Sequence, residues 1–178
     1  MPRHQDLTPE EHARRLRTRL KILTIPVPVD RIAKALGAEI RLSPLDDELS
    51  GMIYVKKDAT PVIGVNALHH PNRQRFTIAH EIGHLEMHRA LIEQKVHVDK
   101  AFPMLRRDAT SATGTNAIEI AANRFAAELL VPEEVLAAMI GDRVIDIDDD
   151  RPIEELARKF KVSKKAMEFR VQRVANRS

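Results

Sequence analysis

One copy of the pattern H-E-x-x-H, at His80-Glu81-Ile82-Gly83-His84, constrains this chain more than any other feature. Positions four apart lie on the same face of an α-helix, so a helix here directs two imidazole rings at one point. Glu81 then projects beside that point, where its carboxylate can act as a general base. Pro71 and Asn72 suit the first turn of such a helix. We therefore expect a helical metal site.

The pattern also has explanations that involve no metal. Chance alone predicts roughly 0.03 copies in a chain of this composition. The two histidines could also be ordinary surface or core residues of an amphipathic helix. Gly83 opposes a helix, because a glycine in mid-helix costs roughly 1 kcal/mol relative to alanine. Its presence is most easily understood if another backbone or a substrate comes close there.

Composition restricts the ligands and the setting. The 178 residues include no Cys, which excludes disulfides and thiolate metal sites and leaves His, Asp, Glu and water. With 43% hydrophobic residues the chain can bury a core. No apolar run approaches a membrane span and the N-terminus has no apolar signal-peptide core, so we expect a cytoplasmic protein. A net charge of +3 permits nucleic-acid contact without predicting it.

The order of the expected elements favours an α+β fold. Thr8-Pro9-Glu10-Glu11 is typical of a capped helix start, and a second, short helix ends at Gly37. A small, mainly antiparallel three-stranded sheet should precede the H-E-x-x-H helix, with strands at Glu39–Leu42, Met52–Lys56 and Val62–Asn66. Residues 94–116 show little periodicity and are expected to be irregular, and a clear helix follows at Ala117–Val131.

Two features of these elements have more than one interpretation. The first helix carries a basic face, which is usually solvent-exposed surface but could meet an acidic partner; its residues are Arg14, Arg15, Arg17, Arg19 and Lys21. Tyr54, the only tyrosine, is either a cross-strand packing residue or a phenol near the metal that stabilises an oxyanion.

The end of the chain suggests a helical pair. The acidic run Asp146–Asp150 is most simply a solvated linker, because the spacing and the glycine of an EF-hand are absent. A helix, a short turn with Ser163 as N-cap and a basic helix then outline a helix-turn-helix. We favour a helical pair that packs on the main domain over a DNA-reading module.

A third metal ligand must come from elsewhere. A metzincin would place a His six residues after His84, where this chain has Ala90. A glutamate on a later helix is the alternative, and Glu119-Ile-Ala-Ala-Asn123 supplies one. Four-residue spacing puts the carboxylate of Glu119 and the amide of Asn123 on one face, so the amide can hold a ligating histidine in place.

Other residues compete for these roles. The rival ligands are Glu128, Asp99 and Asp108. His88 lies one turn beyond His84, and we expect it to support a ligand from behind or to lie on the surface.

These residues carry a resemblance to a known family. Gln74–His84, His88 and Glu119–Pro132 resemble the ImmA/IrrE family of zinc metallopeptidases, and so do Leu49–Tyr54, Val62–Asn66 and Leu156–Arg170. The resemblance covers residues 28 to 172 and leaves the first helix poorly matched. It departs from the family at Ile82, where Leu is common, and at Val131, where Met is common.

The resemblance implies a minimal thermolysin-like peptidase. His80, His84 and Glu119 are then the metal ligands and Glu81 the catalytic base. Zinc is the implied metal, with manganese as an alternative for this ligand set. We accordingly divide the chain into an N-terminal helix (1–27), a metallopeptidase core (28–145) and a helix-turn-helix-like pair packed on the core (146–178).

The resemblance also suggests a partner. Members that have been studied cleave helix-turn-helix repressors that control mobile elements or stress responses, so a repressor is the expected protein substrate. The alternative is a DNA-binding or repressor-docking module in which the basic helix Lys164–Arg177 acts and the metal site is structural or vestigial. Nucleic acid is then an uncertain and secondary partner, no membrane is expected, and the sequence does not indicate an oligomeric state.

Overall fold

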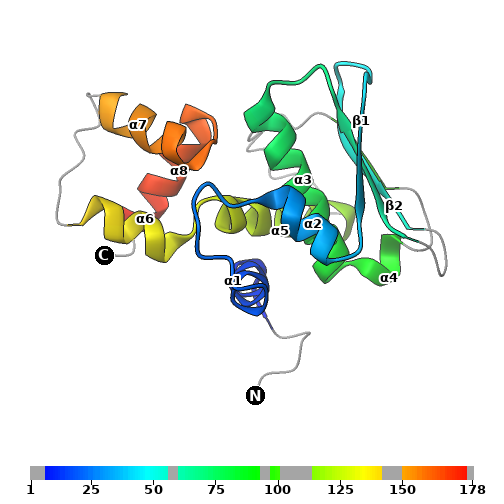
Figure 1. The fold of residues 1–178 in the computed structure, drawn as a ribbon, viewed down its shortest axis with the longest axis horizontal. Coiled ribbons are helices and arrows are strands. Elements are labelled where there is room, and N and C mark those ends of the chain that lie inside the picture. The colour runs from blue at the N-terminus through cyan, green and yellow to red at the C-terminus, as the bar shows by residue number, and fades with distance from the viewer. Residues whose placement is uncertain (1–6, 56–59, 93–96, 101–113, 142–149, 176–178) are drawn as a thin grey trace.

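The computed structural model describes residues 7–55, 60–92, 97–100, 114–141 and 150–175. Its α+β architecture, as predicted, sets one small sheet against a group of helices (Figure 1). The strands are β1 (Glu39–Ser43), β2 (Leu49–Tyr54), β3 (Val62–Asn66) and β4 (His97–Lys100). The helices are α1 (Pro9–Arg19), α2 (Val29–Ala35), α3 (Pro71–Met87), α4 (Arg89–Ile92), α5 (Gly114–Leu130), α6 (Glu133–Ile140), α7 (Asp150–Phe160) and α8 (Lys164–Ala175).

The sheet has the strand order β1-β3-β2-β4. β2 runs antiparallel to both of its neighbours, whereas β1 runs parallel to β3. The expected three strands are present, but the sheet has a fourth, β4, in the segment that we expected to be irregular. A strand of four residues is too short for its alternation to stand out in a sequence. Ile53, Ile63 and Val65 are fully buried and belong to the hydrophobic core.

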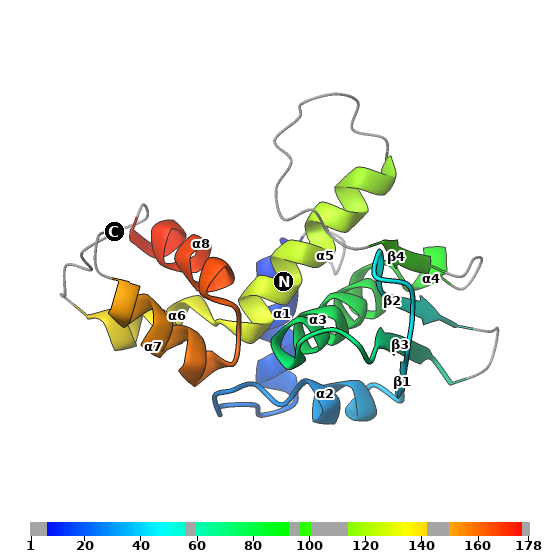
Figure 2. The ribbon, with the colours of Figure 1, turned by 90° about the horizontal axis from the view of Figure 1, so that it is seen from above.

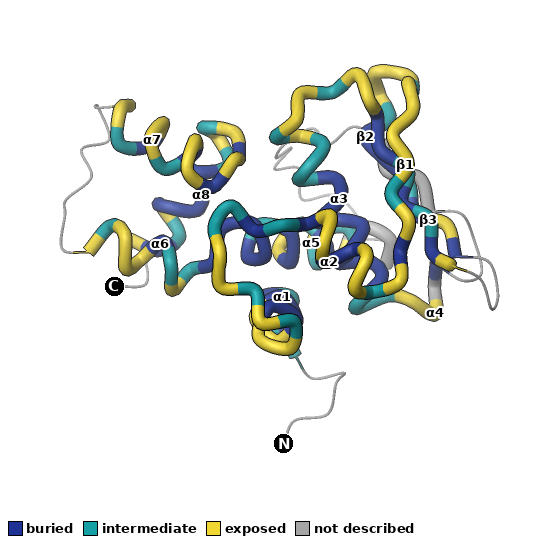
Figure 3. The backbone as a smooth tube through the Cα atoms, in the orientation of Figure 1, coloured by how far each residue is buried: buried dark blue, intermediate teal, exposed yellow. Residues whose placement is uncertain are grey.

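Helices α3 and α5 form the centre of the molecule, and α5 runs along α3 (Figure 2). Both helices carry long buried stretches, which Figure 3 shows in dark blue. At Gly83 a Cβ atom would lie 3.0 Å from Cδ1 of Phe125 and 3.4 Å from Cα of Ala122. The close approach expected at Gly83 is therefore present, and the approaching element is α5. Glycine at this position lets the two helices that carry the candidate ligands come together.

Helix α1 starts with the predicted capping box. The backbone N–H of Glu11 donates to Oγ1 of Thr8, and the backbone N–H of Thr8 donates to the Glu11 carboxylate at 2.7 Å. Ala13 and Leu16 are fully buried, and α1 packs along α5. Arg17, which we placed on the basic face, is instead 9% exposed and paired with Glu134.

The pair formed by α7 and α8 packs on the rest of the chain. The side-chain amide of Asn72, in the first turn of α3, donates to the carbonyl of Val162 at 3.0 Å. Arg170 on α8 lies with Nη2 2.6 Å from Oε2 of Glu128 and 2.7 Å from the carbonyl oxygen of Val131. Both charged groups are buried. The division of the chain into three parts remains a prediction.

Within the described ranges, no helix combines the length and the apolar character that crossing a membrane requires.

Candidate metal centre

The H-E-x-x-H segment lies in the second half of α3. Nδ1 of His70, the N-cap residue, accepts a hydrogen bond from the backbone N–H of Asn72 at 3.2 Å, and Pro71 occupies the first helical position. The helix continues through Gly83 to Met87 without a break. His80 and His84 therefore share one face, and both are fully buried.

Helix α5 brings Glu119 to the same place. The two Nε2 atoms of His80 and His84 are 2.9 Å apart. Oε2 of Glu119 lies 3.3 Å from Nε2 of His80, and Oε1 lies 3.5 Å from Nε2 of His84. In the part of the chain that the structure describes, these three residues form the one group whose candidate ligand atoms, all within 4.8 Å of one another, could hold a metal ion.

The chemistry of this group suits a metal ion. Each of the two imidazole nitrogens lies 3.3–3.5 Å from one oxygen of the Glu119 carboxylate. With one ligand atom from each residue, the three atoms lie within 4.8 Å of one another. Two imidazoles and one carboxylate are also a donor set that zinc accepts in peptidases, with a fourth position left for water or substrate. The residues present therefore fit the metal that the sequence predicts.

Both histidines are held from behind by a polar side chain. Oδ1 of Asn123 lies 3.1 Å from Nδ1 of His80. An amide oxygen only accepts hydrogen bonds, so the hydrogen of His80 is on Nδ1 and the lone pair of Nε2 faces Glu119 and His84. Nδ1 of His88 lies 3.3 Å from Nδ1 of His84. A hydrogen on Nδ1 of His84 can be donated to Nδ1 of His88, which leaves the lone pair of Nε2 directed at Glu119.

Glu81 is fully buried on the side of α3 that faces β2. Its Oε1 would lie 3.5 Å from a Cβ atom placed on Gly51. A carboxylate one residue after His80 thus stays beside the three converging side chains and does not join them.

Solvent access to the centre is uneven. The side chains of His80 and His84 have no exposed area, whereas that of Glu119 is 23% exposed. The solvent-exposed part of the group therefore belongs to Glu119 on α5.

Tyr54 is not brought to this centre. Gly51 faces α3, and Met52, the next residue of β2, faces the other way, where its side chain would meet a Cβ atom on Gly64. Because side chains alternate along a strand, Tyr54 shares the face of Met52. Tyr54 is 41% exposed at the end of β2, which favours the packing interpretation over a role at the metal.

Of the three rival ligands, the structure describes only the side chain of Glu128. Glu128 is fully buried, but its carboxylate is bound by Arg170. Burial raises the pKa of Glu128, and the charge and hydrogen bond of Arg170 oppose that rise. The side chain of Asp99 and the whole of Asp108 lie outside the described residues, as does most of the acidic run 146–150.

Gly51 is a residue of this site that our sequence reasoning missed. A Cβ atom there would lie 2.3 Å from Cγ2 of Thr77 and 2.8 Å from the carbonyl oxygen of Gly64. Only glycine lets β2 pass this close to α3 and leave room for Glu81. The sequence could have indicated this role, because a glycine inside a predicted strand often marks the close approach of another element.

A comparison with models of protein families identifies the family of this chain. The model of the IrrE N-terminal-like domain, a peptidase family, matches residues 33–172. This chain belongs to that family. The IrrE-like match covers both ligand-bearing helices and the C-terminal pair as far as α8, and it confirms the resemblance read from the sequence. No curated protein matches the chain.

A solved structure shares the fold of this IrrE-like chain. It is described as a Mycobacterium tuberculosis transcriptional regulator, with 19% sequence identity and a TM-score of 0.57. The similarity covers 89% of this chain and 44% of the regulator, so this chain spans less than half the length of that protein. At this identity the likeness concerns the fold alone.

Proposed function

We propose that this chain is a zinc-dependent endopeptidase that cleaves a protein substrate, a helix-turn-helix transcriptional repressor, and so relieves repression of stress-response or mobile-element genes. The observation that carries the proposal is the convergence of His80, His84 and Glu119, together with the buried Glu81 one residue after His80. Membership of a peptidase family supports the reaction class. The repressor as substrate rests on the resemblance to family members that cleave such proteins.

In this proposal each residue of the site has its own role. His80, His84 and Glu119 hold a zinc ion, with manganese as the alternative metal. When bound, the ion supplies a Lewis acid that polarises a peptide carbonyl and makes water easier to deprotonate. Glu81 takes a proton from the attacking water and returns it to the leaving amine. Asn123 and His88 keep the two imidazoles oriented.

Whether peptide cleavage depends on Glu81 can be tested without knowing the natural substrate. A denatured bacterial proteome, incubated with the zinc-loaded protein, is labelled at newly formed N-termini and compared with the same proteome incubated with Glu81→Gln. The proposal predicts a reproducible set of new termini that is absent with Glu81→Gln, although that variant keeps its metal. Equal sets of termini from the two proteins would remove Glu81 from the role of base.

The repressor is tested separately. Intact helix-turn-helix repressors from the source genome are incubated with the protein and followed by mass spectrometry. A single cut in one repressor, dependent on Glu81, is the expected result. If peptides are cleaved but every repressor stays intact, the peptidase survives and the substrate assignment fails.

A second candidate is the DNA-binding or repressor-docking module with a vestigial metal site. The placement of the α8 cations speaks against DNA reading by this helix. Arg170 binds Glu128, and Arg173 lies 2.5 Å from the Glu10 carboxylate. Lys164 lies 2.5 Å from the carboxylate of Asp150. A duplex needs several unpaired cations on one face to bind phosphates, so titration with labelled DNA at two salt concentrations should show no strongly salt-dependent binding.

A further inference from the structure

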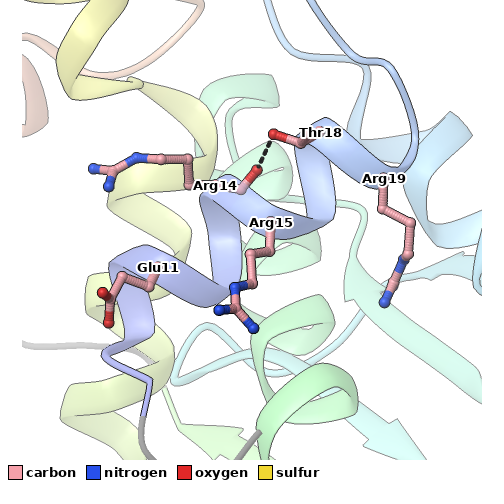
Figure 4. A pocket seen from close by; sticks show the side chains of 5 residues that line it. All are labelled: Glu11, Arg14, Arg15, Thr18 and Arg19. Atoms are coloured by element: carbon pink, nitrogen blue, oxygen red, sulfur yellow. Dashed lines mark hydrogen bonds between the residues drawn. The ribbon is translucent and has the colours of Figure 1, made fainter. Parts of the chain in front are cut away.

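The exposed side of α1 contains a hollow that the proposed peptidase reaction does not use. It has a volume of about 490 Å³ and is lined by Glu11, Arg14, Arg15, Thr18 and Arg19 (Figure 4). All five residues come from one helix, at positions three or four residues apart. Figure 4 shows Arg14 directed toward one side of α1, and Arg15 and Arg19 toward the other.

The three arginines differ in how firmly they are held. Nη2 of Arg19 lies 2.6 Å from Oε1 of Glu86 on α3, which fixes the direction of its side chain. Arg14 lies 3.8 Å from Glu128, whose carboxylate is bound more closely by Arg170. Among the described residues, Arg15 has no hydrogen bond and no ion pair within 4 Å. Two oriented cations thus flank a third one that is available to a partner.

The carboxylate of Glu11 lies at the start of the hollow, where hydrogen bonds from Thr8 and the charges of Arg15 and Arg14 lower its pKa. It accepts hydrogen bonds from the backbone N–H of Thr8 at 2.7 Å and from its hydroxyl at 2.9 Å. The capping box therefore holds Glu11 at the start of the helix. The middle and the far end of the hollow remain basic, with Thr18 between them as a hydroxyl that bonds to the carbonyl of Arg14 at 3.0 Å.

From this arrangement we infer that the Arg14–Arg15–Arg19 hollow of α1 is a docking site for an acidic peptide segment of a partner protein. Carboxylates lying along the hollow meet guanidinium groups from both of its sides. Arg forms paired hydrogen bonds with carboxylates, which gives such a contact direction as well as charge complementarity.

A peptide fits better than a nucleic acid for two reasons. Tight duplex binding draws on roughly 6–10 phosphate contacts, whereas the hollow offers three arginines, of which Arg19 is paired with Glu86 and Arg14 lies 3.8 Å from Glu128. Glu11 and Glu86 also lie at its ends, where a continuous phosphate backbone would be repelled. An acidic peptide can present carboxylates only where the arginines are.

The test is binding of a fluorescein-labelled, glutamate-rich peptide to the full chain, followed by fluorescence anisotropy at low and at physiological salt. The inference predicts saturable binding that weakens as salt rises, because the contacts are exposed ion pairs. Arg15→Glu should weaken binding by about fivefold or more. This exposed side chain has no close partner to lose, so circular dichroism and thermal unfolding should stay those of the native chain.

Arg158→Glu on α7 is the matched control, because it makes the same charge change at another exposed helical arginine. It should leave peptide affinity within about twofold. Binding should also be unchanged in Glu81→Gln, so failure of the peptidase proposal and failure of this inference are distinguishable. Absence of saturable binding, equal weakening by Arg158→Glu, or tighter and equally Arg15-dependent binding of a labelled DNA duplex would each overturn the inference.

Discussion

Oδ1 of Asn123 lies 3.1 Å from Nδ1 of His80, so α5 holds from behind a histidine that α3 presents to the candidate metal site. Asn123 follows Glu119 by one helical turn. A single helix therefore supplies one candidate ligand and the support of another. Since support of this kind fixes the tautomer and the ring direction of a ligand, its loss should be felt in metal affinity.

Replacing Asn123 tests this relationship. Asn123→Leu should lower zinc affinity by about 10–100-fold, because His80 loses the acceptor that keeps its hydrogen on Nδ1. Asn123→Asp offers an acceptor of the same size and should stay close to the native affinity. Competition with a zinc-binding dye measures both. Equal affinities for the Leu variant and the native chain would show that Asn123 does not orient His80.

Gly51 allows a second prediction about the contact between β2 and α3. Gly51→Ala places a methyl group against Thr77 and the Gly64 carbonyl, and should cost about 1–3 kcal/mol in the free energy of unfolding. Gly64→Ala is the matched control in the neighbouring strand. Its new methyl group would lie 3.0 Å from Cγ of the flexible Met52 side chain and 3.9 Å from the Met52 carbonyl oxygen.

Urea unfolding followed by circular dichroism compares the two glycine variants. Gly51→Ala should also reduce cleavage, because the strand and helix that enclose Glu81 must move apart. A Gly51→Ala protein that is no less stable than Gly64→Ala would contradict the close contact.

The buried ion pair between Arg170 and Glu128 should matter more to stability than its exposed neighbours. Arg170→Ala leaves the Glu128 carboxylate buried without its cation and should cost about 3–5 kcal/mol. Arg173→Ala removes a partly exposed contact with Glu10 and should cost about 1 kcal/mol or less. Chemical unfolding of both variants gives the comparison, and equal losses would mean that α8 is not anchored through Arg170.

Acid should loosen α1. Burial alone would raise the pKa of Glu10, but the hydrogen bond from Arg124 and the charges of Arg173 and Arg124 outweigh it and hold that pKa below its usual value of 4.5. Because the folded-state pKa is the lower one, this stabilisation is fully present above about pH 4.5 and is lost as the pH falls through the folded-state pKa. Glu10→Gln should therefore flatten the loss of stability below that pH.

Thermal unfolding between acid and neutral pH tests the role of Glu10. Glu155→Gln, on the exposed side of α7, serves as the control and should keep the native pH dependence. A Glu10→Gln curve parallel to the native one would place the acid sensitivity elsewhere.

The site was more predictable from the sequence than the sheet was. The spacing of His80 and His84 depends on local helix geometry, which a sequence pattern expresses directly, whereas Glu119 came from a pattern on a later helix and from the family resemblance. The approach of α5 to α3 was foreshadowed by Gly83, because a glycine that opposes helix propensity needs a packing reason.

Features set by long-range packing were harder to foresee. The parallel pairing of β1 with β3 and the addition of β4 depend on how strands meet, which short segments do not reveal. Arg17 looked like part of a basic surface and is buried, because its partner Glu134 lies far along the chain. Tyr54 lies on the outer face of β2, and its direction followed from strand register and not from residue type.

Metal content tests the central claim most directly. The purified chain and its Glu119→Ala variant are loaded with zinc, dialysed against trace chelator and measured by elemental analysis, with Glu81→Gln as the control that keeps all three ligands. The account predicts about one zinc per chain in the native protein and in Glu81→Gln, and a loss of zinc in Glu119→Ala. Zinc retained equally by Glu119→Ala, or no zinc in any of the three proteins, would contradict a metal centre formed by His80, His84 and Glu119.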